Sequence, residues 1–292
     1  MAIFKKRSQT SLELITTHLR PIFDELESER KKVVNLFHFT IFFWIIVVAV
    51  TFFALTKRLI IIDPALYRQL DHRMLFIPVA IVAISFLPYY ARRKSYRRHF
   101  KTDVVSKVVR LFGESFSYQP DGALLESYFI QSQLINENFN RYKGEDYIAG
   151  KIDNIPLEFC ELDIRNVTGS GKNRHEHIVF RGIFFCAQLA KNFKGRTFIL
   201  PDKAEQSLGK FFGNFIQEHL MGKVAGRGEL VKLENPIFEK LFVVYGDDQV
   251  EARYHLTPKV MENIVYFYNK YHFQMAISFK GNRLYTAIFL MI

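Results

Sequence analysis

The longest uncharged stretches of the chain lie within its first hundred residues. Residues 33–56 hold no Asp, Glu, Lys or Arg. A helix of that length, at about 1.5 Å per residue, exceeds the roughly 30 Å hydrocarbon core of a bilayer. Residues 74–91 form a second, shorter uncharged run, in which Pro88 predicts a kink near the end. The two runs predict a two-helix transmembrane hairpin over residues 33–91.

Ahead of the first run, apolar residues recur at steps of three and four from Leu12 to Leu26, which predicts an amphipathic helical segment within residues 1–32. Pro21 is expected to break or kink this helix, because proline lacks the N–H that an interior position donates. The apolar stripe is expected to pack against another helix of this protein. A partner's helix and the membrane surface are the alternatives.

Beyond the hairpin, residues 92–122 are predicted to form a basic juxtamembrane helix that ends in a turn at Pro120-Asp121-Gly122. Short strand-like runs between turn signals then predict a cytosolic α+β domain over residues 123–292, with a mainly antiparallel sheet and packed helices. The predicted strands are 146–152, 155–162, 178–189, 196–200, 229–233, 241–245, 249–256, 273–279 and 284–291. The predicted helices are 123–134, 204–220 and 258–271. Residues 163–177, polar and glycine-containing, are expected to be a surface loop.

Charge separates the two parts of the chain. Residues 1–101 carry 17 Lys+Arg and 7 Asp+Glu, whereas residues 102–292 carry 23 and 22. Because the larger part is nearly neutral, no nucleic-acid-binding surface is expected there. By the positive-inside rule both termini are cytoplasmic and the loop 57–73 is external. The basic residues expected to anchor the spans at lipid headgroups are Lys31, Lys32, Arg92, Arg93, Lys94, Arg97 and Arg98.

The larger part holds few motifs that indicate chemistry. Cys160 and Cys186 lie in predicted strands without metal-binding spacing, so they are expected to be buried thiols. No catalytic residue, metal site or cofactor is predicted. Four polar residues remain candidates for a site that forms only in three dimensions: His175, His177, Glu251 and Arg253. Glu251 and Arg253 lie two apart on a predicted strand, so they are expected to share a face.

The stretches FEKLFVVY at 238–245, DQVEAR at 248–253 and LTP at 256–258 resemble the signature of an uncharacterised bacterial family. The stretches GEDYIAG at 144–150 and FRGIFF at 180–185 fit the same pattern. Members of that family have two N-terminal spans and a C-terminal domain of unknown function. The resemblance implies a bacterial membrane protein without an assigned activity, and a LemA-type membrane protein as a candidate partner. The signature itself is interpreted as a scaffold of two strands over residues 239–256, with Thr257 capping the next helix.

These observations favour a protein of the bacterial inner membrane that is not an enzyme. Its cytosolic domain would bind another membrane protein or a second copy of itself. An enzyme at the membrane surface, with a site built from the four polar candidates, is the alternative. A transport component is disfavoured, because the spans carry few polar residues beyond Asn35 and His38.

Overall fold

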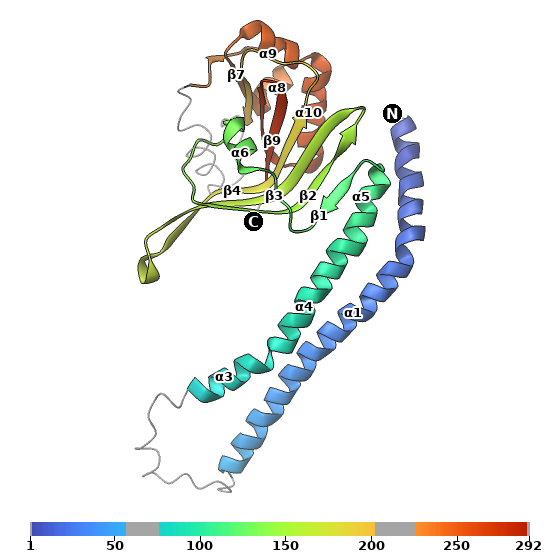
Figure 1. Cartoon of the computed structure of the whole chain (residues 1–292), viewed down its shortest axis with the longest axis vertical. Helices are drawn as coiled ribbons and strands as arrows, with labels where there is room; N and C mark the ends of the chain where they lie inside the picture. Colours follow the sequence, from blue (N-terminus) through green and yellow to red (C-terminus); the bar gives the residue numbers. More distant parts are fainter. Residues whose placement is uncertain (1, 57–75, 202–225, 291–292) are drawn as a thin grey trace. The chain divides into compact units, whose positions relative to one another are not determined.

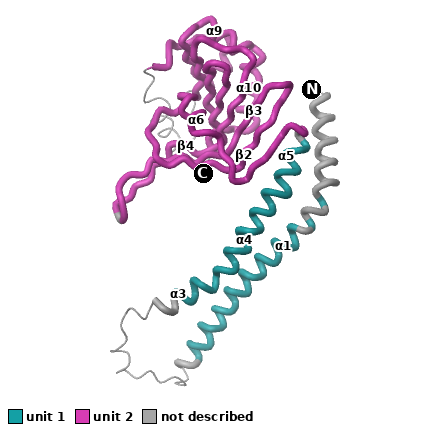
Figure 2. The backbone as a smooth tube through the Cα atoms, in the orientation of Figure 1, with its two compact units in different colours: residues 1–111 teal, residues 112–292 magenta. Residues whose placement is uncertain are grey.

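The computed structural model describes residues 2–56, 76–201 and 226–290 (Figure 1). Contacts divide the chain into two compact units, Met1–Leu111 and Phe112–Ile292 (Figure 2). The first unit is helical and contains the apolar runs. The second contains the sheet and the helices that cover it. The predicted helix 204–220 and the predicted external loop 57–73 lie outside the described residues.

The first unit begins with one long helix, α1 (Ala2–Thr56). It continues through Pro21, so of the two expected outcomes there, a break or a kink, the break does not occur. A proline removes one backbone hydrogen bond, and the turns on both sides of it keep theirs. Among the described residues, one helical segment, Leu26–Phe53 of α1, is long and apolar enough to cross a membrane.

The second uncharged run is divided between two helices. α3 (Phe76–Ser85) and α4 (Leu87–His99) are separated at Phe86. Pro88 lies in the first turn of α4. A backbone N–H at this position would have no carbonyl of the same helix to donate to, so its absence costs no helical hydrogen bond. The predicted kink therefore occurs, but neither helix alone has the length of a span. The basic segment continues through a π-helical stretch (Phe100–Val105) and α5 (Ser106–Phe112).

In the described part of the second unit, nine strands form one sheet in the order β1-β2-β3-β4-β9-β8-β5-β7-β6. Every neighbouring pair is antiparallel, which confirms the predicted α+β class. The strands are β1 (Ser117–Gln119), β2 (Arg141–Ile152), β3 (Ile155–Thr168), β4 (His175–Gln188), β5 (Thr197–Pro201), β6 (Glu229–Leu230), β7 (Phe242–Gly246), β8 (Gln274–Lys280) and β9 (Arg283–Phe289).

The predicted hairpin turn between β2 and β3 is confirmed. Asp153 and Asn154 have φ values of +47° and +66°, as a two-residue primed turn requires. The expected loop 163–177 is wrong, because β3 and β4 stay paired as far as Thr168 and His175. We call residues 163–178 the β3–β4 arm; it projects from the sheet (Figure 1). Apart from the fully buried Ile164, the described side chains of the arm are half-buried or exposed, which accounts for its polar composition.

In the described part of the second unit, four α-helices accompany the sheet: α6 (Glu126–Ser132), α8 (Pro236–Leu241), α9 (Gln249–His255) and α10 (Pro258–Tyr271). α10, capped by Thr257, matches its prediction, whereas α6 is shorter than the predicted helix 123–134. The predicted strand 249–256 is wrong, since these residues form α9. The Asp248 carboxylate accepts hydrogen bonds from the backbone N–H groups of Val250 and Glu251, which starts a helix there.

Adjacent residues of each strand contribute to different cores, because side chains alternate between the faces of a sheet. Phe198 belongs to the cluster on the α6 side, with Phe129, Phe180 and Phe184. Its neighbour Ile199 belongs to the cluster under α8, α9 and α10. Helices therefore cover both faces around β5.

Candidate functional site

The two helical stretches of the first unit run antiparallel, which brings their basic residues to the same level. Glu29 lies 3.3 Å from the ring of His99, and the rings of Phe37 and Tyr89 are 4.9 Å apart. Residues later in α1 therefore contact residues earlier in α4, as expected for antiparallel helices. The seven anchoring residues of the sequence prediction are all exposed along these helices. We call them the basic collar: Lys31, Lys32, Arg92, Arg93, Lys94, Arg97 and Arg98.

Next to the collar, α1 presents apolar side chains outward. Phe39 and Phe42 are more than 60% exposed. Of the most apolar window of Leu26–Phe53, only 11% is buried. A core helix of a soluble protein would bury most of this surface, because exposed aliphatic and aromatic groups are unfavourable in water. This surface suits a lipid environment.

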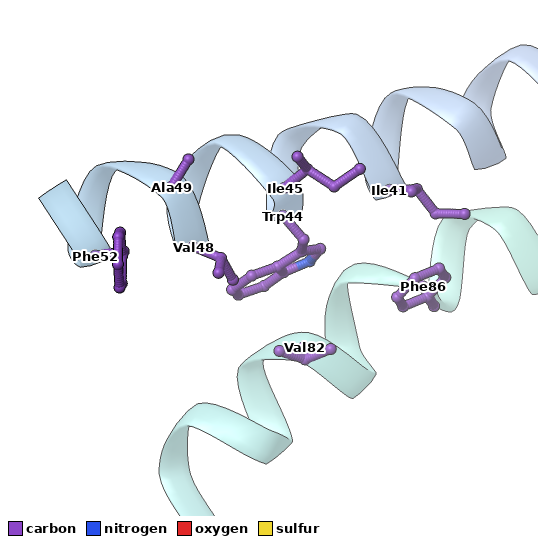
Figure 3. A pocket seen from close by; sticks show the side chains of 8 residues that line it. All are labelled: Ile41, Trp44, Ile45, Val48, Ala49, Phe52, Val82 and Phe86. Atoms are coloured by element: carbon purple, nitrogen blue, oxygen red, sulfur yellow. The ribbon is translucent and has the colours of Figure 1, made fainter.

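Between α1 and the α3–α4 segment lies an apolar groove of about 660 Å³ (Figure 3). Its side chains are Ile41, Trp44, Ile45, Val48, Ala49, Phe52, Val82 and Phe86. Trp44 points from α1 toward Val82 and Phe86 (Figure 3). Its indole N–H donates a hydrogen bond of 2.9 Å to the hydroxyl of Ser85, the polar link between the two helices at this depth.

A second apolar groove, of about 500 Å³, lies in the second unit between α10 and the sheet. We call it the α10 groove. It is lined by Phe159, Ile183, Phe185, Val260, Asn263, Ile264, Phe267, Met275, Thr286 and Ile288. Val260, Ile264 and Phe267 share one face of α10, at helical spacing. Phe159 and Phe185, paired across β3 and β4, are only half-buried, because α10 covers this part of the sheet incompletely.

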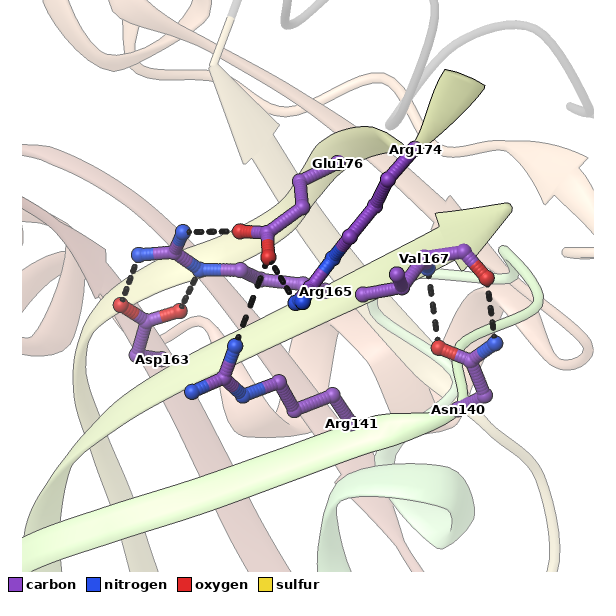
Figure 4. A network of polar contacts seen from close by, with 7 residues as sticks. All are labelled: Asn140, Arg141, Asp163, Arg165, Val167, Arg174 and Glu176. Atoms are coloured by element: carbon purple, nitrogen blue, oxygen red, sulfur yellow. Dashed lines mark hydrogen bonds and ion pairs between the residues drawn. The ribbon is translucent and has the colours of Figure 1, made fainter. Parts of the chain in front are cut away.

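Farther along the same strands the apolar lining gives way to an ion network in the arm (Figure 4). The Arg165 guanidinium donates to Asp163 at 2.5 and 2.7 Å and to Glu176 at 2.7 Å, and Arg174 also donates to Glu176. Hydrogen bonding to Arg165 lowers the pKa of both carboxyl groups. The side chain of Asn140 adds two hydrogen bonds to the backbone of Val167. The network thus ties together strands that have little core beneath them.

The structure places the four polar candidates in two separate regions. His175 and His177 lie at the start of β4 in the arm, where His177 is 3.4 Å from Glu137. Glu251 and Arg253 lie on α9, at the other end of the domain (Figure 1). Among the described residues, no three His, Cys, Asp or Glu side chains gather as a metal site would require.

The expectation that Glu251 and Arg253 share a strand face is wrong, because both belong to a helix. The Glu251 carboxylate accepts hydrogen bonds from the backbone N–H groups of Lys194 and Gly195, at 3.2 and 2.7 Å. The Arg253 guanidinium instead reaches the carbonyl oxygens of Gln249 and Lys232. Glu251 therefore holds the segment before β5, and the two side chains are not paired with each other.

Both cysteines are buried and unpaired, as predicted. Burial raises the pKa of the Cys160 thiol to about 11, so this thiol is neutral and unreactive at physiological pH. The sequence prediction missed the α10 groove. A signal for it existed in Ile183, Phe184 and Phe185, since three consecutive apolar residues indicate a strand with apolar contacts on both faces.

Comparisons with known proteins add a family for the C-terminal part of the chain. Residues 178–291 match the family described as "Protein of unknown function (DUF3137)". A search of curated proteins finds no match. The mycobacterial trehalose monomycolate transport factor A, TtfA, has a TM-score of 0.36 and 9% identity, over 60% of this chain and 74% of that chain. The match begins within β4 at Ile178, runs through β9 and includes the signature at 238–258, so the C-terminal part of this chain matches a domain family of unknown function.

Proposed function

We propose that this protein is anchored in the bacterial inner membrane by a helical hairpin and that its α+β domain is a cytoplasmic protein-interaction module. The observation that carries the proposal is the outward apolar surface of Leu26–Phe53 beside the basic collar. Aliphatic surface favours the hydrocarbon core, and exposed Lys and Arg favour the anionic cytoplasmic leaflet. With α1 entering and the α3–α4 segment returning, both termini are cytoplasmic and residues 57–73 are external.

The α10 groove supports the second half of the proposal. Eight of its lining side chains are apolar and one of its walls is an open strand pair. Apolar clefts of this kind are the usual cores of protein–protein contacts, where Phe and Met are enriched. The partner is another membrane protein or a second copy of this chain, and the family resemblance makes a LemA-type protein one candidate.

Site-specific photo-crosslinking in native membranes tests this assignment. A photoreactive side chain at Phe267, which lines the groove, should yield a discrete adduct. The same group at Tyr266, the adjacent outward-facing position that is 63% exposed, should yield none. Two differently tagged copies of the chain distinguish self-association from a second protein. Equal adducts from the two positions, or none from Phe267, would contradict the module.

A further inference from the structure

A polar cavity of about 480 Å³ lies on the α6 side of the sheet, at the turn between β8 and β9. Four cationic side chains line it: Lys194, Arg196, Lys280 and Arg283. Among the described residues, Asp247 is the one carboxylate of the lining. The cavity therefore carries a surplus of positive charge, in a domain whose overall charge is nearly balanced.

Arg196 and Asp247 neutralise each other. The Arg196 guanidinium donates to both oxygens of Asp247, at 2.7 and 2.9 Å, and also to the Gln131 side-chain oxygen at 3.1 Å. That oxygen accepts a further hydrogen bond, of 3.3 Å, from the Tyr285 hydroxyl. The surplus positive charge of the cavity therefore comes from Lys194, Lys280 and Arg283.

Lys280 and Arg283 are directly opposite each other in the β8–β9 register. Two like charges in this position destabilise a hairpin unless something compensates for them. The Arg283 guanidinium lies 4.2 Å from the centre of the Tyr128 ring and donates a hydrogen bond of 3.4 Å to the Cys186 sulfur, and these two contacts orient it. In the described part of the chain, neither Lys194 nor Lys280 forms an ion pair. Within the described lining, the Asp247 carboxylate is already bound to Arg196, so no lining carboxylate is left to balance these two opposed cations.

We infer that this cavity binds a phosphate group. A planar guanidinium held by stacking matches two phosphate oxygens, and the two ammonium groups supply charge without a fixed direction. The volume is far larger than the roughly 30 Å³ of one water molecule, so it has room for what the phosphate is attached to. A soluble phosphate compound and a phospholipid headgroup present the same chemistry.

Lysine acetylation read by mass spectrometry tests the inference on the full chain. In a neutral detergent, inorganic pyrophosphate should protect Lys194 and Lys280. Lys259, whose side chain is 78% exposed on α10, is the internal control and should react unchanged. The second arm uses nanodiscs of zwitterionic lipid with and without an anionic phospholipid. Protection by pyrophosphate assigns a soluble ligand, and protection by the anionic lipid alone assigns a headgroup. No protection in either arm, or equal protection of Lys259, overturns the inference.

Variants separate this cavity from general electrostatic attraction. Lys280→Gln should weaken pyrophosphate binding about tenfold or more, because it removes a charge-assisted contact. Lys280→Arg keeps the charge and should bind like the parent, which also shows that position 280 tolerates substitution. Lys259→Gln removes the same charge elsewhere and should leave binding unchanged. Equal binding by the parent and Lys280→Gln contradicts the assignment.

Discussion

The indole nitrogen of Trp44 lies 2.9 Å from the hydroxyl oxygen of Ser85, forming a side-chain hydrogen bond between α1 and α3. The Ser85 hydroxyl itself donates to the carbonyl of Val82, so it accepts from Trp44 without losing its own bond. In a bilayer neither group has water as an alternative partner. This contact therefore joins the two arms of the proposed hairpin at one point.

Removing one partner of this contact should loosen the hairpin. Ser85→Ala and Trp44→Phe should each lower the free energy of unfolding by about 0.6–2 kcal/mol, the range for interhelical hydrogen bonds in membranes. The double variant should lose little more than either single one, because both delete the same bond. Unfolding in mixed detergent micelles measures this. Thr51→Val is the control, since the Thr51 hydroxyl bonds only to carbonyls of its own helix. Fully additive losses would contradict the link.

The charge of the basic collar should set the orientation of the returning segment. Replacing Arg92, Arg93, Lys94, Arg97 and Arg98 with Gln removes about 1 kcal/mol of headgroup attraction per residue at most. We expect weaker membrane insertion or an inverted segment, measured by carbonate extraction and protease accessibility. The control replaces five exposed lysines of the second unit with Gln: Lys143, Lys151, Lys232, Lys240 and Lys259. Unchanged insertion of the collar variant would contradict the role of these charges.

Glu251 and Arg253 should differ sharply in their effect on stability. Glu251→Ala leaves two backbone donors without their carboxylate, which should cost about 1.5–3 kcal/mol. Arg253→Ala removes contacts of 3.4 and 3.3 Å from an exposed side chain, so its effect should stay within about 0.5 kcal/mol. Thermal unfolding of the full-length variants measures the difference. Equal losses, or a larger loss for Arg253→Ala, would show that the Glu251 contact is not the structural one.

The residues around Glu251 were predicted to form a strand, and their sequence pattern explains why. Val250, Ala252, Tyr254 and Leu256 alternate with polar residues, which is the pattern of a half-buried strand. In α9 the buried positions are instead Ala252 and His255, followed by the buried C-cap residue Leu256, whereas Val250 and Tyr254 are 77% and 61% exposed. A seven-residue segment is too short for the two periods to be separated. The capping residue Asp248 was the signal that indicated a helix.

Segments with distinctive turns or long periodic faces were predicted well. The Asp153-Asn154 hairpin depends on two residues that accept positive φ, and the face of α10 repeats over four turns. The β3–β4 arm was missed because, beyond the buried Ile164, it is held by pairing between strands and by the ion network around Arg165. The polar cavity at the turn between β8 and β9 was missed because it also depends on contacts between segments that lie far apart in the sequence. Its cations come from positions 194–196 and 280–283, which only the pairing of β5 with β8 brings together.

His255 should make the stability of the second unit depend on pH near neutrality. Its ring stacks on Phe279, with centroids 4.3 Å apart, and meets the edge of Phe193. Burial lowers the pKa of His255, with opposing smaller effects of the charges of Glu251 and Lys191. The folded-state pKa therefore lies below the unfolded value of about 6.5. Below about pH 6.5 the unfolded chain binds more protons at this histidine than the folded chain does. The contribution of neutral His255 to the free energy of unfolding is therefore fully present above that pH and is lost as the pH falls through the folded-state pKa.

Denaturant unfolding between about pH 5 and 7.5 measures this dependence, across the pKa of a free histidine. His255→Phe keeps a ring in the aromatic stack and should flatten the curve. His175→Gln, at an exposed position in the arm, should follow the parent. A pH profile for His255→Phe that is indistinguishable from that of the parent would rule out His255 as its source.

We propose that the chain crosses the membrane twice and leaves its α+β domain in the cytoplasm. The most direct test fuses a reporter that is active only outside the cytoplasm after Asp63, after Asp103 or at the C-terminus. We expect activity for the Asp63 fusion alone, because the positive-inside rule places only the loop 57–73 outside. Activity of the C-terminal fusion would contradict both the hairpin and its orientation.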